Sequence, residues 1–234
     1  MKYQKKKLAG LEIVEVAGDT EGPVILLFHG FGADAYDLVP LSKDYQNNPQ
    51  PTWLFPQGPL EVPLMPGYSG RGWFPIDIEA LQIAVRDNGF EEVAHAFPED
   101  LRPLTDQIHQ LIGELSVPPS KVLLGGFSQG GILAIETILH SPWQLGGAIL
   151  LSTTLIHTPD WKRLAPQHAG TPFFLSHGTE DPMLPFSQAE ALGNLLTNAG
   201  WKGSLHSFPG GHEIPHHILI SLQNFLHTLL SPSS

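Results

Sequence analysis

Short apolar runs, separated by polar, glycine-rich or proline-rich segments, recur along the whole chain. Runs of this length predict β-strands, and they lie at Leu11–Val16, Val24–Phe28, Trp53–Phe55, Val122–Leu124, Ala148–Leu151, Phe173–Leu175 and Ser204–Phe208. In several of the segments between them, the apolar residues repeat with the period of a helix instead. The pattern therefore predicts strands that alternate with helices.

The clearest of these helices spans Pro98–Leu115, where one face is apolar. That stripe consists of Leu101, Leu104, Ile108, Leu111, Ile112 and Leu115. A second helix begins with the spacing Ser187-x-x-Glu190, which predicts a capping box, and runs to about Asn198. A third helix begins near Pro215 and carries further apolar residues at helical spacing.

Alternating strands and helices are typical of an α/β fold with a mostly parallel central sheet and helices on both faces. The chain has 234 residues, which suits one such domain, and no shift in composition marks a second one. We therefore expect a single domain over residues 1–234. In such sheets, sites form in the loops beyond the carboxyl ends of the strands.

Composition and charge exclude several kinds of function. The formal net charge of −11 disfavours a nucleic-acid partner, and we expect the basic run around Lys5–Lys7 to be a solvated N-terminal tail. The absence of cysteine excludes disulfides and thiol chemistry. There is no signal-peptide pattern after the lysines, and no apolar run approaches the roughly 18 residues of a membrane span. We expect a cytoplasmic protein without integral membrane association.

The strongest chemical signal is Gly126-Phe127-Ser128-Gln129-Gly130, between the predicted strand Val122–Leu124 and the apolar run Ile132–Leu139. On a strand-to-helix turn, Gly-x-Ser-x-Gly holds a nucleophilic serine in α/β-hydrolases. A glycine-rich chain also produces this motif by chance, in which case the serine merely caps a helix. The apolar strand and helix around it favour the nucleophile.

Another glycine-rich turn, His29-Gly30-Phe31-Gly32, follows the predicted strand Val24–Phe28. In a hydrolase such a turn supplies one half of an oxyanion hole, and the residue after the serine supplies the other. The donors would be the backbone N–H groups of Phe31 and Gln129. Alternatively, the glycines only permit a tight turn.

The loop after Phe173–Leu175 carries Glu180 and Asp181. A carboxylate there can orient a catalytic histidine by accepting its Nδ1–H. It could instead cap the following helix, although Ser187 is the better candidate for that cap.

His212 follows the last predicted strand on a loop that begins Pro209-Gly210-Gly211. Its position completes the chain order serine, acid, histidine, and its neutral form can accept a proton near pH 7. The residues His212 to His216 also match His-Glu-x-x-His, a zinc-protease motif that needs both histidines on one helix. Pro215 would break that helix, so we expect no metal site, and His216 to open the last helix instead.

Residues 56–75 are predicted to form a long irregular connection. Its apolar residues include Leu64, Met65, Trp73 and Phe74, which are candidate substrate-binding residues in a wall or lid for an acyl group. They could equally pack as ordinary core.

From about Val24 to Phe225, the chain resembles the phospholipase/carboxylesterase family of α/β-hydrolases. The resemblance rests on four blocks in the family's order: 28–34, 126–131, 177–182 and 211–212. It implies a Ser128–Asp181–His212 triad, oxyanion donors at Phe31 and Gln129, and neither metal nor organic cofactor. One departure affects the acyl pocket: the family commonly has aspartate directly after the aromatic pair, whereas here Pro75 and Ile76 follow Trp73-Phe74.

The resemblance implies a serine carboxylesterase that forms an acyl-enzyme with a small-molecule or lipid-like ester. A lysophospholipase or an acyl-protein thioesterase would use the same triad. An inactive hydrolase fold that acts as a binding module is a remote alternative, because every triad position is filled. The sequence leaves open the natural substrate, the acyl-chain length, the stereochemical preference and whether the protein forms a homo-oligomer.

Overall fold

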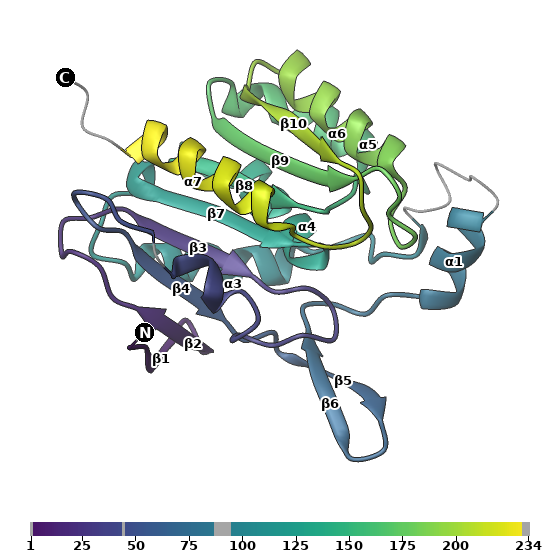
Figure 1. Cartoon of the computed structure of the whole chain (residues 1–234), viewed down its shortest axis with the longest axis horizontal. Coiled ribbons are helices and arrows are strands. Elements are labelled where there is room, and N and C mark those ends of the chain that lie inside the picture. The colour runs from purple at the N-terminus through teal and green to yellow at the C-terminus, as the bar shows by residue number, and fades with distance from the viewer. Residues whose placement is uncertain (1, 44, 87–94, 231–234) are drawn as a thin grey trace.

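The computed structural model describes residues 2–43, 45–86 and 95–230, and these contain an eight-stranded sheet (Figure 1). Its strands, in spatial order, are β1 (Gln4–Leu8), β2 (Leu11–Val16), β4 (Thr52–Pro56), β3 (Val24–Phe28), β7 (Val122–Phe127), β8 (Gly147–Leu151), β9 (Pro172–Gly178) and β10 (Lys202–Phe208). From β4 to β10 neighbouring strands are parallel, whereas β1 and β2 join one edge in antiparallel pairing. The predicted mostly parallel sheet is confirmed.

Helices cover both faces of this sheet. Their bounds are α1 (Ile78–Arg86), α3 (Arg102–Gly113), α4 (Gln129–Leu139), α5 (Thr158–Leu164), α6 (Phe186–Asn198) and α7 (His216–Leu230), with 3-10 turns η1 (Val39–Ser42), η2 (Pro119–Lys121) and η3 (Ala165–His168). One core contains residues of α3 to α6, and the other contains residues of η1 and α7. Strand β3 contributes side chains to both cores, since Leu26 belongs to the first core and its neighbour Ile25 belongs to the second.

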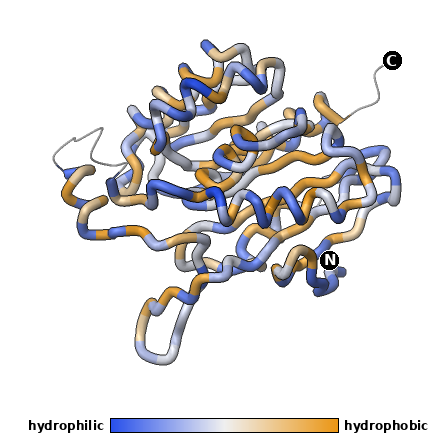
Figure 2. The backbone as a smooth tube through the Cα atoms, turned by 180° about the vertical axis from the view of Figure 1, so that it is seen from behind, coloured by the Kyte–Doolittle hydropathy of each residue, from blue (hydrophilic) through white to orange (hydrophobic). Residues whose placement is uncertain are grey.

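Figure 2 shows hydrophobic residues concentrated along the central strands, with mixed colours on the surrounding helices. The strands in the middle of the sheet are buried at nearly every position because helices pack on both sides. Helix α4 is buried along its whole length and lies against β7 and β8. It is therefore the central helix behind the predicted nucleophile. None of the helices in the described residues is long and apolar enough to span a membrane.

The structure corrects two predicted helix starts. Helix α3 begins at Arg102 instead of Pro98, with Pro103 in its first turn, where proline is favoured, and Asp100 Oδ1 accepts the Arg102 N–H just before it. Helix α6 begins at Phe186 after Pro185, and no side chain caps it. The predicted capping box of Ser187 is therefore wrong, since this serine already lies inside the helix.

Two segments predicted to lack regular structure are strands. The basic run lies in β1, where Lys6 forms an ion pair with Glu15 of β2, so it is not a free tail. The long connection contains a hairpin of β5 (Leu60–Met65) and β6 (Tyr68–Gly72), which projects from the body in Figure 1. Its turn contains Gly67 at φ 80°, a conformation that glycine adopts without strain.

Candidate active site

Ser128 lies between the end of β7 and the start of α4, in a backbone conformation that few residues other than glycine adopt. Its φ is 53° and its ψ is −117°, and such strain costs on the order of 1–3 kcal/mol. The turn is held in place by the Ser128 N–H, which donates to the Leu151 carbonyl of β8 at 2.8 Å. A strained serine on a strand-to-helix turn matches the nucleophile elbow of a hydrolase.

The two glycines of the motif permit this turn because the chain passes very close to itself there. A Cβ on Gly130 would overlap the carbonyl oxygen of Phe28 at the end of β3. A Cβ on Gly126 would overlap the Gly130 carbonyl across the turn. The Gly-x-Ser-x-Gly spacing is therefore required by packing, which a serine that only caps a helix would not need.

His212 lies on the loop after β10, and its ring contacts Asp181. Its Nδ1 is 2.7 Å from Asp181 Oδ2. The Asp181 side chain is fully buried, whereas the His212 side chain is 19% exposed. The competing carboxylate, Glu180, is exposed. The geometry therefore pairs His212 with Asp181, in the orientation that a general base requires.

Burial alone would raise the pKa of Asp181, but hydrogen bonds from His177 and His212 outweigh it and hold the pKa below its usual range. The second oxygen, Oδ1, accepts the N–H groups of Met183 and Leu184 at 2.8 and 3.0 Å. Asp181 therefore caps its own loop as well as contacting His212. Our expectation that Ser187 would leave it free of capping was wrong, because one carboxylate has enough acceptor sites for both roles.

Ser128, His212, Phe31 and Gln129 line one cavity of about 150 Å³. Most of its remaining lining is apolar and consists of Ile76, Ile78, Leu81, Phe97, Phe127, Ile132, Met183 and Leu184. The structure thus brings the predicted nucleophile, base and oxyanion donors to one opening. Asp181 lies behind His212 and away from the cavity.

The turn that carries Phe31 is fixed by its neighbours. The N–H of Gly32 donates to the Arg71 carbonyl at 2.7 Å, and the N–H of Ala33 donates to the Gly30 carbonyl at 3.2 Å. Gln129 is the first residue of α4, and the first N–H groups of a helix have no acceptor within it. Both predicted donors therefore belong to segments suited to binding an oxyanion.

Sequence reasoning missed the role of His29 beneath this turn. Its Nε2 accepts the Gly58 N–H at 3.0 Å, so its Nδ1 carries the hydrogen and donates to the Gly30 carbonyl at 2.8 Å. Burial lowers the pKa of His29, which keeps the ring neutral, as both bonds require. The position of His29 directly before Gly30 was the one signal in the sequence that could have indicated this role.

The four candidate substrate-binding residues lie outside the cavity. Trp73 and Phe74 are buried, and the Gln129 side chain bonds both: its Oε1 accepts the Trp73 N–H at 2.9 Å, and its Nε2 donates to the Phe74 carbonyl at 2.7 Å. Leu64 and Met65 belong to the hairpin and are 47% and 64% exposed. The apolar wall near Ser128 instead includes residues that follow Phe74, namely Ile76, Ile78 and Leu81.

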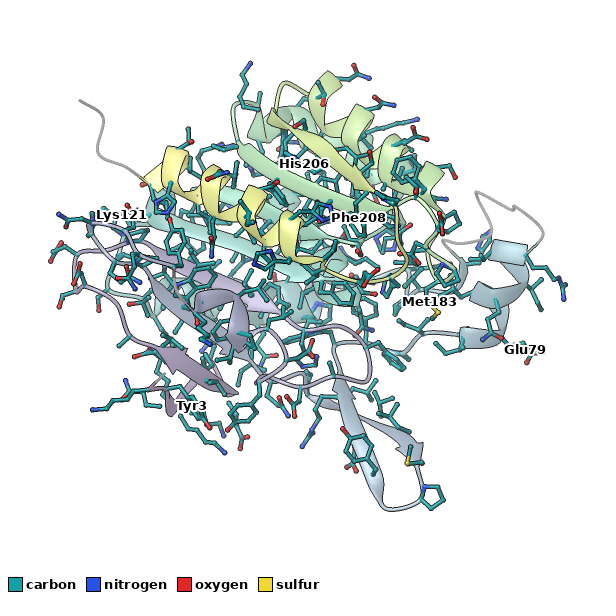
Figure 3. All side chains as sticks on the ribbon, in the orientation of Figure 1. Tyr3, Glu79, Lys121, Met183, His206 and Phe208 are labelled. Atoms are coloured by element: carbon teal, nitrogen blue, oxygen red, sulfur yellow. The ribbon has the colours of Figure 1, made fainter. Side chains whose placement is uncertain are left out.

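Met183 follows Asp181 on the same loop, and Figure 3 shows it near α1, the helix that carries Glu79. With Ile78 and Leu81, it lines both the cavity at Ser128 and a neighbouring one of about 280 Å³. The zinc motif is divided by the start of α7 at His216, so its two histidines do not share a helical face.

Comparison with known proteins places the chain in a family of hydrolases. The sequence profile of the family described as Phospholipase/Carboxylesterase matches residues 9–230. The carboxylesterase SOBER1 of Arabidopsis thaliana is 30% identical, over 90% of this chain and 92% of its own. An acyl-protein thioesterase 1 of Cryptococcus neoformans is 27% identical, over 80% and 79%. A crystal structure of a Bacillus cereus carboxylesterase has a TM-score of 0.73 at 24% identity, over 94% of each chain, and shows the shared α/β-hydrolase fold.

Proposed function

Because the chain belongs to the phospholipase/carboxylesterase family, we propose that it is a serine ester hydrolase that forms an acyl-enzyme on Ser128. The observation that carries the proposal is the shared cavity: the strained serine and the exposed edge of His212 line the same opening, and buried Asp181 holds His212 from behind. A catalytically inactive binding module would have no need for this arrangement.

The proposed reaction uses these groups in turn. Ser128 Oγ attacks the ester carbonyl while His212 Nε2 takes the hydroxyl proton, and Asp181 accepts the Nδ1–H and stabilises the imidazolium. The carbonyl oxygen becomes an oxyanion that the N–H groups of Phe31 and Gln129 stabilise. When the C–O bond breaks, His212 returns the proton to the leaving alcohol. His212 then deprotonates a water molecule, which cleaves the acyl-enzyme and regenerates Ser128.

The cavity beside Ser128 suits the acyl part of the ester. Its lining is mostly apolar, and about 150 Å³ holds on the order of five water-sized groups at about 30 Å³ each. An acyl chain of a few carbons fits this volume without rearrangement. We therefore propose short-chain esters as the preferred substrates.

The decisive experiment labels the protein with a fluorophosphonate and maps the adduct by mass spectrometry. We expect one adduct on Ser128. Ser128→Ala should abolish labelling and lower kcat on p-nitrophenyl butyrate by roughly 10⁴- to 10⁶-fold, since the triad acts as a unit. Ser120→Ala, at an exposed serine of η2, is the control and should label like the wild type. Turnover of Ser128→Ala within tenfold of wild type would overturn the assignment.

A thioesterase is the second candidate, because several of the matched relatives are named acyl-protein thioesterase 1. The same triad would form the same acyl-enzyme from a thioester, with a thiol as the leaving group. Ratios of kcat/KM on p-nitrophenyl esters, acyl thioesters and lysophospholipids of equal chain length separate the three activities. A higher kcat/KM on the p-nitrophenyl esters than on both the thioesters and the lysophospholipids supports the carboxylesterase.

A further inference from the structure

A second histidine contacts the carboxylate of Asp181. His177 lies near the end of β9 and is fully buried. Its Nε2 is 3.2 Å from Asp181 Oδ2 and 3.0 Å from the Leu184 carbonyl oxygen. Both neighbours of Nε2 are acceptors, so this nitrogen carries a hydrogen, which it shares between the Leu184 carbonyl and Asp181 Oδ2. Oδ2 therefore lies between two histidines, with His212 on the other side at 2.7 Å.

These contacts leave the carboxylate of Asp181 a single orientation. Its Oδ1 is occupied by the N–H groups of Met183 and Leu184, and its Oδ2 by the two histidines. A buried carboxylate stays ionised only when such donors compensate for lost water. Among them, His177 is the donor that contacts both the acid and the backbone of the loop that carries it.

We propose that His177 is a positioning residue for catalysis: by donating to Asp181 and to the Leu184 carbonyl, it keeps Oδ2 directed at His212 Nδ1. The inference rests on the proposed triad. The hydrogen bond of His177 to the Leu184 carbonyl also holds a residue of the cavity at Ser128, because Leu184 lines that cavity. Misplacement of a reacting group by about 1 Å can reduce a rate by on the order of 100-fold, so a loose Asp181 should slow the reaction at His212.

The ring nitrogens of His177 allow a sharp choice of variants. Within the described residues, Nδ1 has no hydrogen-bond partner, so the polar role of the ring lies in Nε2 alone. The side-chain amide of glutamine can place an N–H near the position of Nε2. Leucine fills similar space without a donor, and the shorter asparagine does not reach. His168 is a matched control, because it is also buried and bonds a backbone carbonyl, that of Leu139 at 3.2 Å, away from the triad.

The experiment measures kcat and KM on p-nitrophenyl butyrate, per active site counted by complete fluorophosphonate labelling. We expect His177→Leu to lower kcat by about 10- to 100-fold with KM within about threefold, and His177→Gln to recover most of the loss. His168→Leu should keep the wild-type kcat per site even if its stability falls. If His177→Leu does not fold, His177→Asn replaces it in the comparison with His177→Gln.

Two results would overturn the proposal. One is a wild-type kcat per site in His177→Leu or His177→Asn, and the other is an equal loss in His177→Gln. If the wild-type protein labels at Ser128 and the His177 variants give either of these results, only the role of His177 is overturned. If the wild-type protein does not label at Ser128, the proposed function itself is overturned.

Discussion

Gln129 and Asp181 each hold several parts of the site together through a single side chain. Gln129 offers its N–H at the start of α4, while its amide group bonds the Trp73 N–H and the Phe74 carbonyl. Asp181 accepts hydrogen bonds from two histidines and two backbone N–H groups. Substituting either residue disturbs structure and chemistry together. A residue that only lines the cavity is therefore the better probe of specificity.

The side chain of Met183 is such a probe, because it is 43% exposed and lines both the cavity at Ser128 and the neighbouring one beside α1. We expect Met183→Ala to join the two cavities and raise the ratio of kcat/KM for octanoate over acetate esters. The expected change is about tenfold, the effect of roughly one more methylene held in the apolar pocket, since one methylene contributes about 1–3 kcal/mol. Met183→Trp should lower the same ratio. The measurement is a chain-length series of p-nitrophenyl esters.

Met65 provides the control at this scale. It is also an exposed methionine, but it lies in the hairpin and away from the cavity lining. Met65→Ala should leave the chain-length ratio within twofold of wild type. If Met65→Ala shifts the ratio and Met183→Ala does not, the acyl chain lies along the hairpin instead, as the sequence had suggested.

At the scale of elements, the site depends on how closely β3 approaches the turn between β7 and α4. Gly130→Ala tests this contact, because the added Cβ would overlap the backbone carbonyl of Phe28, which cannot move without displacing β3. We expect it to reduce the free energy of unfolding by about 1–3 kcal/mol and to slow fluorophosphonate labelling. Urea denaturation and the labelling rate check the two effects.

Gly113→Ala is the matched control, since this glycine is also helical but a Cβ added to it would meet no atom within 4 Å outside its own helix backbone. Alanine is favoured over glycine in a helix by roughly 0.5–1 kcal/mol. Gly113→Ala should therefore raise the urea midpoint slightly and leave labelling unchanged. Equal effects of the two variants would mean that the contact with Phe28 is unimportant.

The predicted strands are all present in the main sheet, whereas β1 and the separate hairpin β5–β6 were not predicted. β2 and β3 have the predicted bounds, and each of the other predicted strands lies within a strand of the sheet. β1 was missed because its lysines hide the strand pattern, while pairing with β2 supplies its hydrogen bonds. The hairpin β5–β6 was missed because its strands contain proline and glycine and bury few side chains.

At the scale of the whole molecule, the three residues of the proposed triad were easier to find in the sequence than the lining of the cavity beside Ser128. Ser128, Asp181 and His212 each follow a predicted strand, and parallel strands bring their carboxyl ends to one edge. The apolar wall has no such signal, because α1, Phe97, α4 and the Asp181 loop contribute to it from distant parts of the sequence. Only tertiary packing determines which of these side chains reach the serine.

The net charge of −11 acts on every substrate that approaches this site. Glu180 and Glu213 are the neighbours of Asp181 and His212 in the chain, and both are exposed, so the field near the opening is negative. An anionic ester should be repelled at low salt, when the Debye length is about 30 Å, and less so at 0.15 M, when it is about 8 Å. We therefore expect kcat/KM for a singly anionic succinate ester to rise about two- to threefold between 0.01 and 0.15 M NaCl. The neutral butyrate ester should change little, and an equal salt response of both esters would show that the charge of the molecule does not reach the site.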